Sequence, residues 1–126
     1  MIPANELRIG NWAYDNKLNG CIRFTSFHGL CNIENKPDDY DPIPLTPEVL
    51  EKCGFLDTGT RYIGTPDEPI VWSSGYEEIR KDFGRYEYVL YSDEWDSNLK
   101  SITVDYVHQL QNIYFAITGE GLTVNL

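Results

Sequence analysis

The sequence is short of cysteine, histidine and basic residues, and it has no long apolar run. Its 126 residues include three cysteines, two histidines and 10 lysines and arginines, against 20 acidic residues. No apolar stretch approaches the roughly 18 residues that a membrane-spanning helix needs. The first residues carry neither the basic nor the apolar segment of a secretion signal. These absences favour a cytoplasmic protein that does not bind a membrane.

The three cysteines, Cys21, Cys31 and Cys53, are too few and too widely spaced for a disulfide framework. We therefore expect reduced thiols that serve as small core residues. His28 and Cys31 form an H-x-x-C pair, but zinc needs four ligands at recognised spacings, and C-x-x-C is absent. Phosphate-binding glycine loops and a G-x-S-x-G elbow are absent as well. We expect neither a metal nor any other cofactor.

The acidic balance also narrows the class of partner. A net charge of −10 repels phosphate backbones, so the sequence predicts no nucleic-acid binding and leaves a basic protein partner open. The 41% hydrophobic and 13% aromatic content is enough apolar area to offset chain entropy. We expect one folded domain over residues 1–126.

Short β-segments punctuated by glycine and proline dominate the chain. In the N-terminal part we predict a strand over 7–14 that bends at Gly10, an Asn-Gly turn over 15–20, and strands over 21–27 and 30–34. A β-meander should follow, with strands over the ranges 61–63, 70–72, 76–81 and 86–91. A last edge strand is predicted over 122–124.

Two helices carry recognisable end signals. Thr46 is suited to be the N-cap and Pro47 the first residue of a short helix that ends at Gly54. A second helix is predicted over 104–117, with Thr103 as its N-cap and Gly119 after its end. Its apolar face should consist of Tyr106, Val107, Leu110, Ile113, Tyr114 and Ile117, and its polar face of Asp105, His108, Gln109 and Asn112.

These elements predict an α+β fold. We expect a curved antiparallel β-meander of about five to seven strands, barrel-like at its N-terminal end, with one short central helix and a C-terminal amphipathic helix packed on the sheet. Leu110, Tyr114 and Ile117 should be buried against that sheet, while Asp105 and Gln109 should be exposed.

Three segments resemble a group of short, uncharacterised proteins from anaerobic gut bacteria and their phages and mobile elements. The segments are ELRIGNWAYD, PIPLTPEVLEKCGF and YVHQLQNIYFAITGEGLT, and together they cover roughly a third of the chain. The resemblance implies a context, that of a cytoplasmic accessory protein carried by a phage or prophage. It implies no activity, cofactor or catalytic residue.

Two acidic runs, residues 38–41 and 93–96, each place an aromatic residue among carboxylates. Neither has the alternating oxygen ligands and central glycine of a calcium loop. They are either solubilising loops or a binding surface for a basic partner, with Tyr40 and Trp95 as anchors and carboxylates such as Asp93 and Asp96 steering the encounter.

A stripe on the C-terminal helix is the other candidate site. Asp105, His108 and Asn112 are spaced i, i+3 and i+7, so on one helix they would line up, and Asp105 could orient the His108 ring for acid–base chemistry. The alternative is a solvated helix face, since no nucleophile accompanies the histidine.

Three functional hypotheses follow from these features. The first is a non-enzymatic protein-interaction module, and the second is a small-ligand-binding domain with an aromatic-lined pocket on the meander. The third is an enzyme that uses His108. A flat exposed patch would favour the first hypothesis, and an enclosed aromatic pocket would favour the second.

Overall fold

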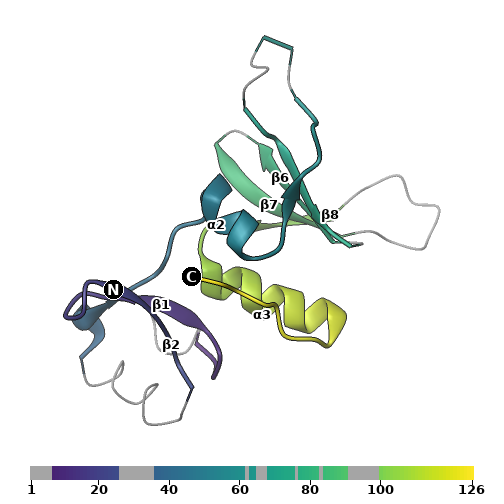
Figure 1. Ribbon diagram of the computed structural model, residues 1–126. Helices are drawn as coiled ribbons and strands as arrows, with labels where there is room; N and C mark the ends of the chain where they lie inside the picture. The colour runs from purple at the N-terminus through teal and green to yellow at the C-terminus, as the bar shows by residue number, and fades with distance from the viewer. Residues whose placement is uncertain are drawn as a thin grey trace. The chain divides into compact units, whose positions relative to one another are not determined.

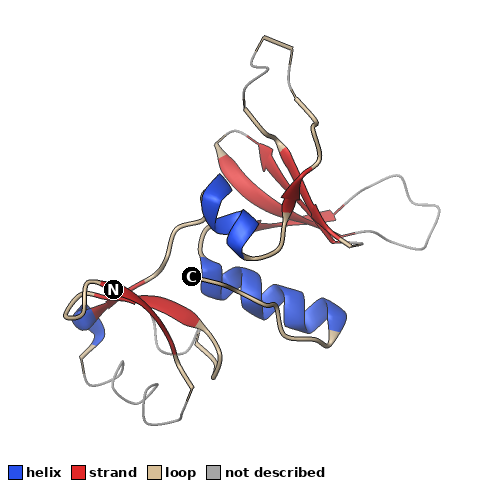
Figure 2. Cartoon of the chain, in the orientation of Figure 1, coloured by secondary structure: helices blue, strands red, loops and turns tan. Residues whose placement is uncertain are grey.

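The computed structural model describes residues 7–25, 36–61, 63–64, 68–75, 77–82, 84–90 and 100–126. Two antiparallel sheets and two α-helices make up this part of the chain, which confirms the predicted α+β class (Figures 1 and 2). Neither sheet closes into a barrel within the described ranges.

The chain divides into two compact units, one of residues 1–44 with 106–122 and one of 45–105 with 123–126. The expectation of one domain over 1–126 stays a prediction, and the units are described in turn.

The first unit contains a three-stranded sheet. Its strands are β1 (Trp12–Asp15), β2 (Gly20–Arg23) and β3 (Tyr40–Asp41), with β1 in the middle and both neighbours antiparallel to it. Ala13 is fully buried and forms a small core with Leu7 and Phe24, against which Ile22 and Tyr40 pack. Burial of these apolar side chains is the main force that holds so short a sheet together.

The turn between β1 and β2 follows the predicted chemistry. The Asp15 carboxylate accepts hydrogen bonds from the backbone N–H groups of Lys17 (2.9 Å) and Leu18 (3.2 Å). Asn19 adopts φ 52°, a left-handed conformation that asparagine tolerates better than most residues. The predicted Asn-Gly turn is confirmed.

The first strand begins later than predicted, because the backbone turns at Ile9–Gly10. Gly10 has φ 97°, which favours glycine, and the N–H of Asn11 donates to the carbonyl of Arg8 at 3.0 Å. Regular pairing therefore starts at Trp12, and the predicted bend at Gly10 is a full turn.

Helix α3 (Val107–Thr118) begins three residues later than predicted. Thr103 is not its N-cap but lies in a strand, β8 (Lys100–Val104), because these residues pair with the preceding strand. Tyr106, with an extended backbone, precedes the first helical residue. Gly119 ends the helix as predicted, with φ 75° and its N–H bonded to the Phe115 carbonyl at 2.9 Å.

Polar side chains dock α3 on β1. The Gln111 side chain accepts a hydrogen bond from the Trp12 N–H (2.9 Å) and donates one to the Gly10 carbonyl (2.9 Å). The Asn11 side-chain amide donates to the Asn112 side chain at 3.1 Å. The predicted separation into a buried apolar face and a solvated polar face is therefore wrong, since Gln111 is buried and Asn112 half-buried.

The burial of other α3 residues corrects the same prediction. Leu110 is fully buried, as expected, but Ile117 is 43% exposed and Tyr114 is only half-buried. His108, assigned to the polar face, is 1% exposed. Asp105 and Gln109, expected to be exposed, are half-buried.

The second unit contains a five-stranded antiparallel meander. Its strands, in spatial order, are β4 (Leu56–Asp57), β5 (Val71–Ser74), β6 (Glu77–Asp82), β7 (Arg85–Leu90) and β8. The predicted strands near 70–72, 76–81 and 86–91 correspond to β5, β6 and β7. The strands predicted over 61–63 and 122–124 are wrong, because the described residues of these ranges are not in strands. Strands β4 and β8 were not predicted.

One face of this sheet is apolar. Trp72, Ile79 and Tyr88 are cross-strand partners, so their side chains share that face, and each is at most 1% exposed. The Tyr86 ring, on the same face, meets the Trp72 ring edge-on at a centroid distance of 5.5 Å. The meander thus buries its large aromatic side chains on one side.

The short helix α2 (Pro47–Lys52) follows its sequence signals closely. The Thr46 hydroxyl caps it by accepting a hydrogen bond from the Val49 N–H at 3.2 Å. Leu50 is fully buried, and Gly54 continues the chain at φ 86°. Neither α2 nor α3, the α-helices of the described ranges, has the length and apolar character needed to cross a membrane.

Leu110 and Ile117 test the revised burial of α3. Leu110→Ala should lower the free energy of unfolding by about 2–5 kcal/mol, because it leaves a cavity at a fully buried position. Ile117→Ala should cost about 1 kcal/mol or less, since its side chain already contacts water. Chemical denaturation of both variants checks this. Equal losses would contradict the burial pattern.

Candidate functional site

The loop site predicted around Tyr40 and Trp95 is only partly described. Asp93, Trp95 and Asp96 lie outside the described residues, as does the predicted strand over 30–34. Tyr40 lies in β3, half-buried, with its ring edge-on to that of Phe24 at a centroid distance of 5.6 Å. Burial raises the pKa of Tyr40, and the carboxylates of Asp15 and Asp39 raise it further. Its ring is therefore part of the packing of the small sheet.

The carboxylates of this first acidic run contact the neighbouring β1–β2 turn. Asp39 forms an ion pair with Lys17 at 3.1 Å, and Asp41 accepts a hydrogen bond from the Asn16 side chain at 3.0 Å. Asp38 is exposed. The run thus has a structural role in holding the turn.

The stripe predicted on the C-terminal helix does not form as one helical row. Asp105 precedes α3, and its carboxylate is bonded to Arg85 at 2.9 Å. The buried His108 ring stacks on Tyr106, with centroids 5.9 Å apart and planes at 10°. Asn112 accepts the hydrogen bond from Asn11. A general acid or base must reach its substrate, and the 1% exposure of His108 leaves it little access.

Of the cysteines, Cys53 is buried, as predicted for a small core residue, but Cys21 is exposed, so that prediction is wrong for Cys21; both are free thiols. Burial raises the pKa of Cys53 to about 11, which makes it a poor nucleophile at neutral pH. His28 and Cys31 lie outside the described residues. Within the described ranges, no group of three or more His, Cys, Asp or Glu side chains is placed to hold a metal ion.

A hollow of about 590 Å³ lies in the second unit, on the face of the meander opposite its aromatic core. This hollow was not predicted from the sequence. Its lining consists of Thr58, Thr60, Ile70, Val71, Glu78, Arg80, Lys81 and Glu87.

Strand register explains why charged side chains meet there. Val71, Arg80 and Glu87 are successive cross-strand partners on β5, β6 and β7, so they share one face. Glu78 lies two residues before Arg80 on β6 and hence on the same face. Lys81 belongs to the other face, and its ammonium lies 5.8 Å from the centre of the Tyr86 ring.

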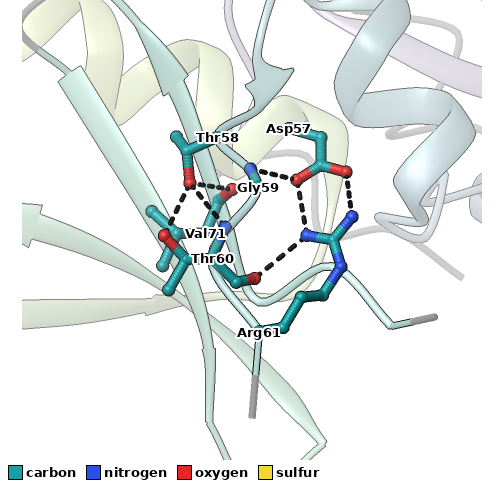
Figure 3. Close-up of polar contacts among 6 residues, drawn as sticks. All are labelled: Asp57, Thr58, Gly59, Thr60, Arg61 and Val71. Carbon is teal, nitrogen blue, oxygen red and sulfur yellow. Dashed lines mark hydrogen bonds and ion pairs between the residues drawn. The ribbon is translucent and has the colours of Figure 1, made fainter. Parts of the chain in front are cut away.

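The loop after β4 forms one wall of the hollow, and Figure 3 shows its hydrogen bonds. The Asp57 carboxylate binds the Arg61 guanidinium through both oxygens, at 2.8 and 2.6 Å, and accepts the Gly59 N–H at 2.8 Å. Thr58 donates its hydroxyl proton to the Val71 carbonyl at 3.1 Å, and its own N–H bonds the same oxygen at 3.0 Å. The loop is thereby fixed to β5.

The charged groups on the floor of the hollow are partly paired. Arg80 Nε donates to Glu78 at 2.7 Å. Glu87, on the next strand, accepts a hydrogen bond from the Ser101 hydroxyl at 3.3 Å. Two carboxylates and one guanidinium thus share this face, while Lys81, which also lines the hollow, has its ammonium beside the Tyr86 ring.

The signal for this surface was present in the sequence. Residues 77–82 and 85–90 alternate between core and charged positions, with Ile79, Tyr86 and Tyr88 on one side and Glu78, Arg80 and Glu87 on the other. The alternation of charged and apolar residues along these two strands indicates that one surface of the sheet is polar. The positions of Thr58 and Thr60 next to this surface depend on the pairing of β4 with β5, and β4 was not predicted.

Comparison with protein-family models, curated proteins and solved structures gives no match for this chain.

The ion pair between Asp57 and Arg61 predicts how the protonation of Asp57 depends on pH. The hydrogen bonds from Arg61 and then Gly59 lower the pKa of Asp57 from its ordinary 3.8 to about 2. Because the folded pKa is depressed, the pair's contribution to stability is complete above pH 3.8 and is lost as pH falls through about 2. A carbon-detected NMR titration of the Asp57 carboxyl should show a midpoint near the lower value.

Two variants control this titration. Arg61→Gln should move the midpoint of Asp57 back toward 3.8, whereas Arg80→Gln, on the sheet, should leave it unchanged. A wild-type midpoint at the ordinary value would contradict the bidentate pair.

Proposed function

We propose that this protein is a non-enzymatic protein-interaction module that binds a partner with a basic surface. The observation that carries the proposal is the polar hollow on the meander, where Glu78 and Glu87 flank Arg80 in a chain of net charge −10. Acidic surfaces of this kind raise the rate of encounter with basic proteins and disfavour acidic ones.

The distribution of aromatic residues in the second unit favours this proposal over a small-ligand pocket lined by aromatic rings. Trp72, Tyr86 and Tyr88 are all at most 8% exposed. The hollow instead presents hydroxyl groups, charges and two aliphatic side chains. Such a lining suits the mixed polar contacts of a protein interface better than the mostly apolar enclosure typical of small-molecule sites.

The burial of His108 counts against the enzymatic alternative, since a stacked, buried ring has poor access to a substrate. The acidic–aromatic surface around Tyr40, Asp93, Trp95 and Asp96 stays a prediction and is the second candidate for the binding surface. The resemblance to proteins of gut bacteria and their phages adds a cytoplasmic, accessory context to the proposal.

Selection from a random-peptide display library tests the proposal, because it reports the charge of the preferred ligand whatever the partner is. The immobilised protein should enrich peptides rich in arginine and lysine. Their binding should weaken as salt rises, since exposed charges are screened beyond about 8 Å at physiological ionic strength.

The control is a charge-matched double variant in the hollow, Glu78→Gln with Glu87→Gln, compared with Glu48→Gln with Glu51→Gln on α2. Loss of the basic consensus in the hollow variant alone would locate binding there. An absence of enriched peptides, or a consensus without basic residues, would refute the proposal.

A further inference from the structure

We infer that the hollow on the outer face of the meander receives an arginine side chain of the partner, an inference that rests on the proposed function. The lining leaves hydrogen-bonding capacity unused at Thr60 and Glu87, and it has an apolar wall formed by Ile70 and Val71.

The two threonine hydroxyls form a directed chain. The single hydroxyl proton of Thr58 goes to the Val71 carbonyl at 3.1 Å. The contact of 2.9 Å between the Thr58 and Thr60 oxygens must therefore use the proton of Thr60. The lone pairs of the Thr60 oxygen therefore stay available to accept a hydrogen bond from a ligand in the hollow, which Thr60 lines.

The carboxylates add further acceptors. Arg80 donates through Nε to Glu78, and the ammonium of Lys81, the other basic residue of the lining, lies beside the Tyr86 ring. Glu87 accepts from the Ser101 hydroxyl, a neutral group, and no ion pair joins it to a basic side chain of the described residues. The hollow thus offers a carboxylate and a hydroxyl oxygen to a ligand that brings donors and positive charge.

A guanidinium fits these acceptors better than an ammonium. It presents five N–H donors in a planar fork that can bond a carboxylate through two of them and reach a neighbouring oxygen with a third. It is also less strongly hydrated than an ammonium, and so is more easily bound at a partly open surface. The half-buried Ile70 and Val71 provide apolar surface for the methylene stem.

The probe for the test is the capped tripeptide acetyl-Gly-Arg-Gly-amide, compared with versions that carry lysine or citrulline in place of arginine. Citrulline keeps the planar shape of arginine but lacks its charge. NMR titration of the isotope-labelled protein should give saturable shifts at the amides of Thr58, Thr60 and Glu87 with the arginine peptide. Lysine should bind more weakly, and citrulline should cause no saturable change.

Three variants locate the effect. Glu87→Gln should weaken the arginine peptide about tenfold, the usual effect of losing one charge-assisted hydrogen bond, and Thr60→Val should weaken it several-fold. Glu51→Gln removes the same charge from α2, away from the lining, and should leave affinity unchanged. Unaltered amide spectra elsewhere in the protein verify that each variant is folded.

The other outcomes contradict the inference alone or the inference together with the proposed function. Equal binding of lysine or citrulline would overturn the assignment to arginine. If the arginine peptide or the display-selected basic peptides bind wild-type and Glu87→Gln protein equally, the hollow is not the receptor, although the proposed function stands. If no basic peptide binds the wild-type protein, both the inference and the proposed function fail.

Discussion

The side chain of Gln111 provides the contact on which the first unit depends. It satisfies the Trp12 N–H and the Gly10 carbonyl, which come from a segment 99 or more positions earlier in the chain. Bringing such distant segments together costs loop-closure entropy. Because one amide must meet both a donor and an acceptor, the contact also fixes the position of α3 along β1. Loss of the Gln111 amide would leave the Trp12 N–H and the Gly10 carbonyl without this hydrogen-bond partner, which makes the contact costly to break.

The second unit depends on a different constraint, the alternation of side chains along β6 and β7. That alternation buries Ile79 and Tyr88 on one side and brings Arg80 and Glu87 together on the other. The apolar face stabilises the meander, and the polar face carries the hollow that is proposed to bind a partner. The loop of residues 57–61, held by its own ion pair, adds hydroxyl groups to that face. Stability and the proposed function therefore come from opposite sides of one sheet.

Local chemistry was enough to predict some elements and not others. Helix α2 could be predicted because Thr46, Pro47 and Gly54 act within one or two turns of the chain. The start of α3 could not, because the sequence from Thr103 is compatible with a helix and only pairing between β7 and β8 makes Thr103 extended. The docking role of Gln111 was missed for the same reason, since its partners lie at the other end of the sequence. The hollow required the strand register and the loop after β4 together.

The measurement that tests this account most directly is the free energy of unfolding of Gln111→Met. Methionine has similar length and helix propensity to glutamine but offers neither a strong donor nor a strong acceptor. We expect a loss of about 1–3 kcal/mol, because the Trp12 N–H and the Gly10 carbonyl lose their partner. The control variant Ala116→Met places the same side chain at an exposed position of the same helix and should cost about 0.5 kcal/mol or less. If Gln111→Met loses no more free energy of unfolding than Ala116→Met, the side-chain amide does not hold α3 to the sheet.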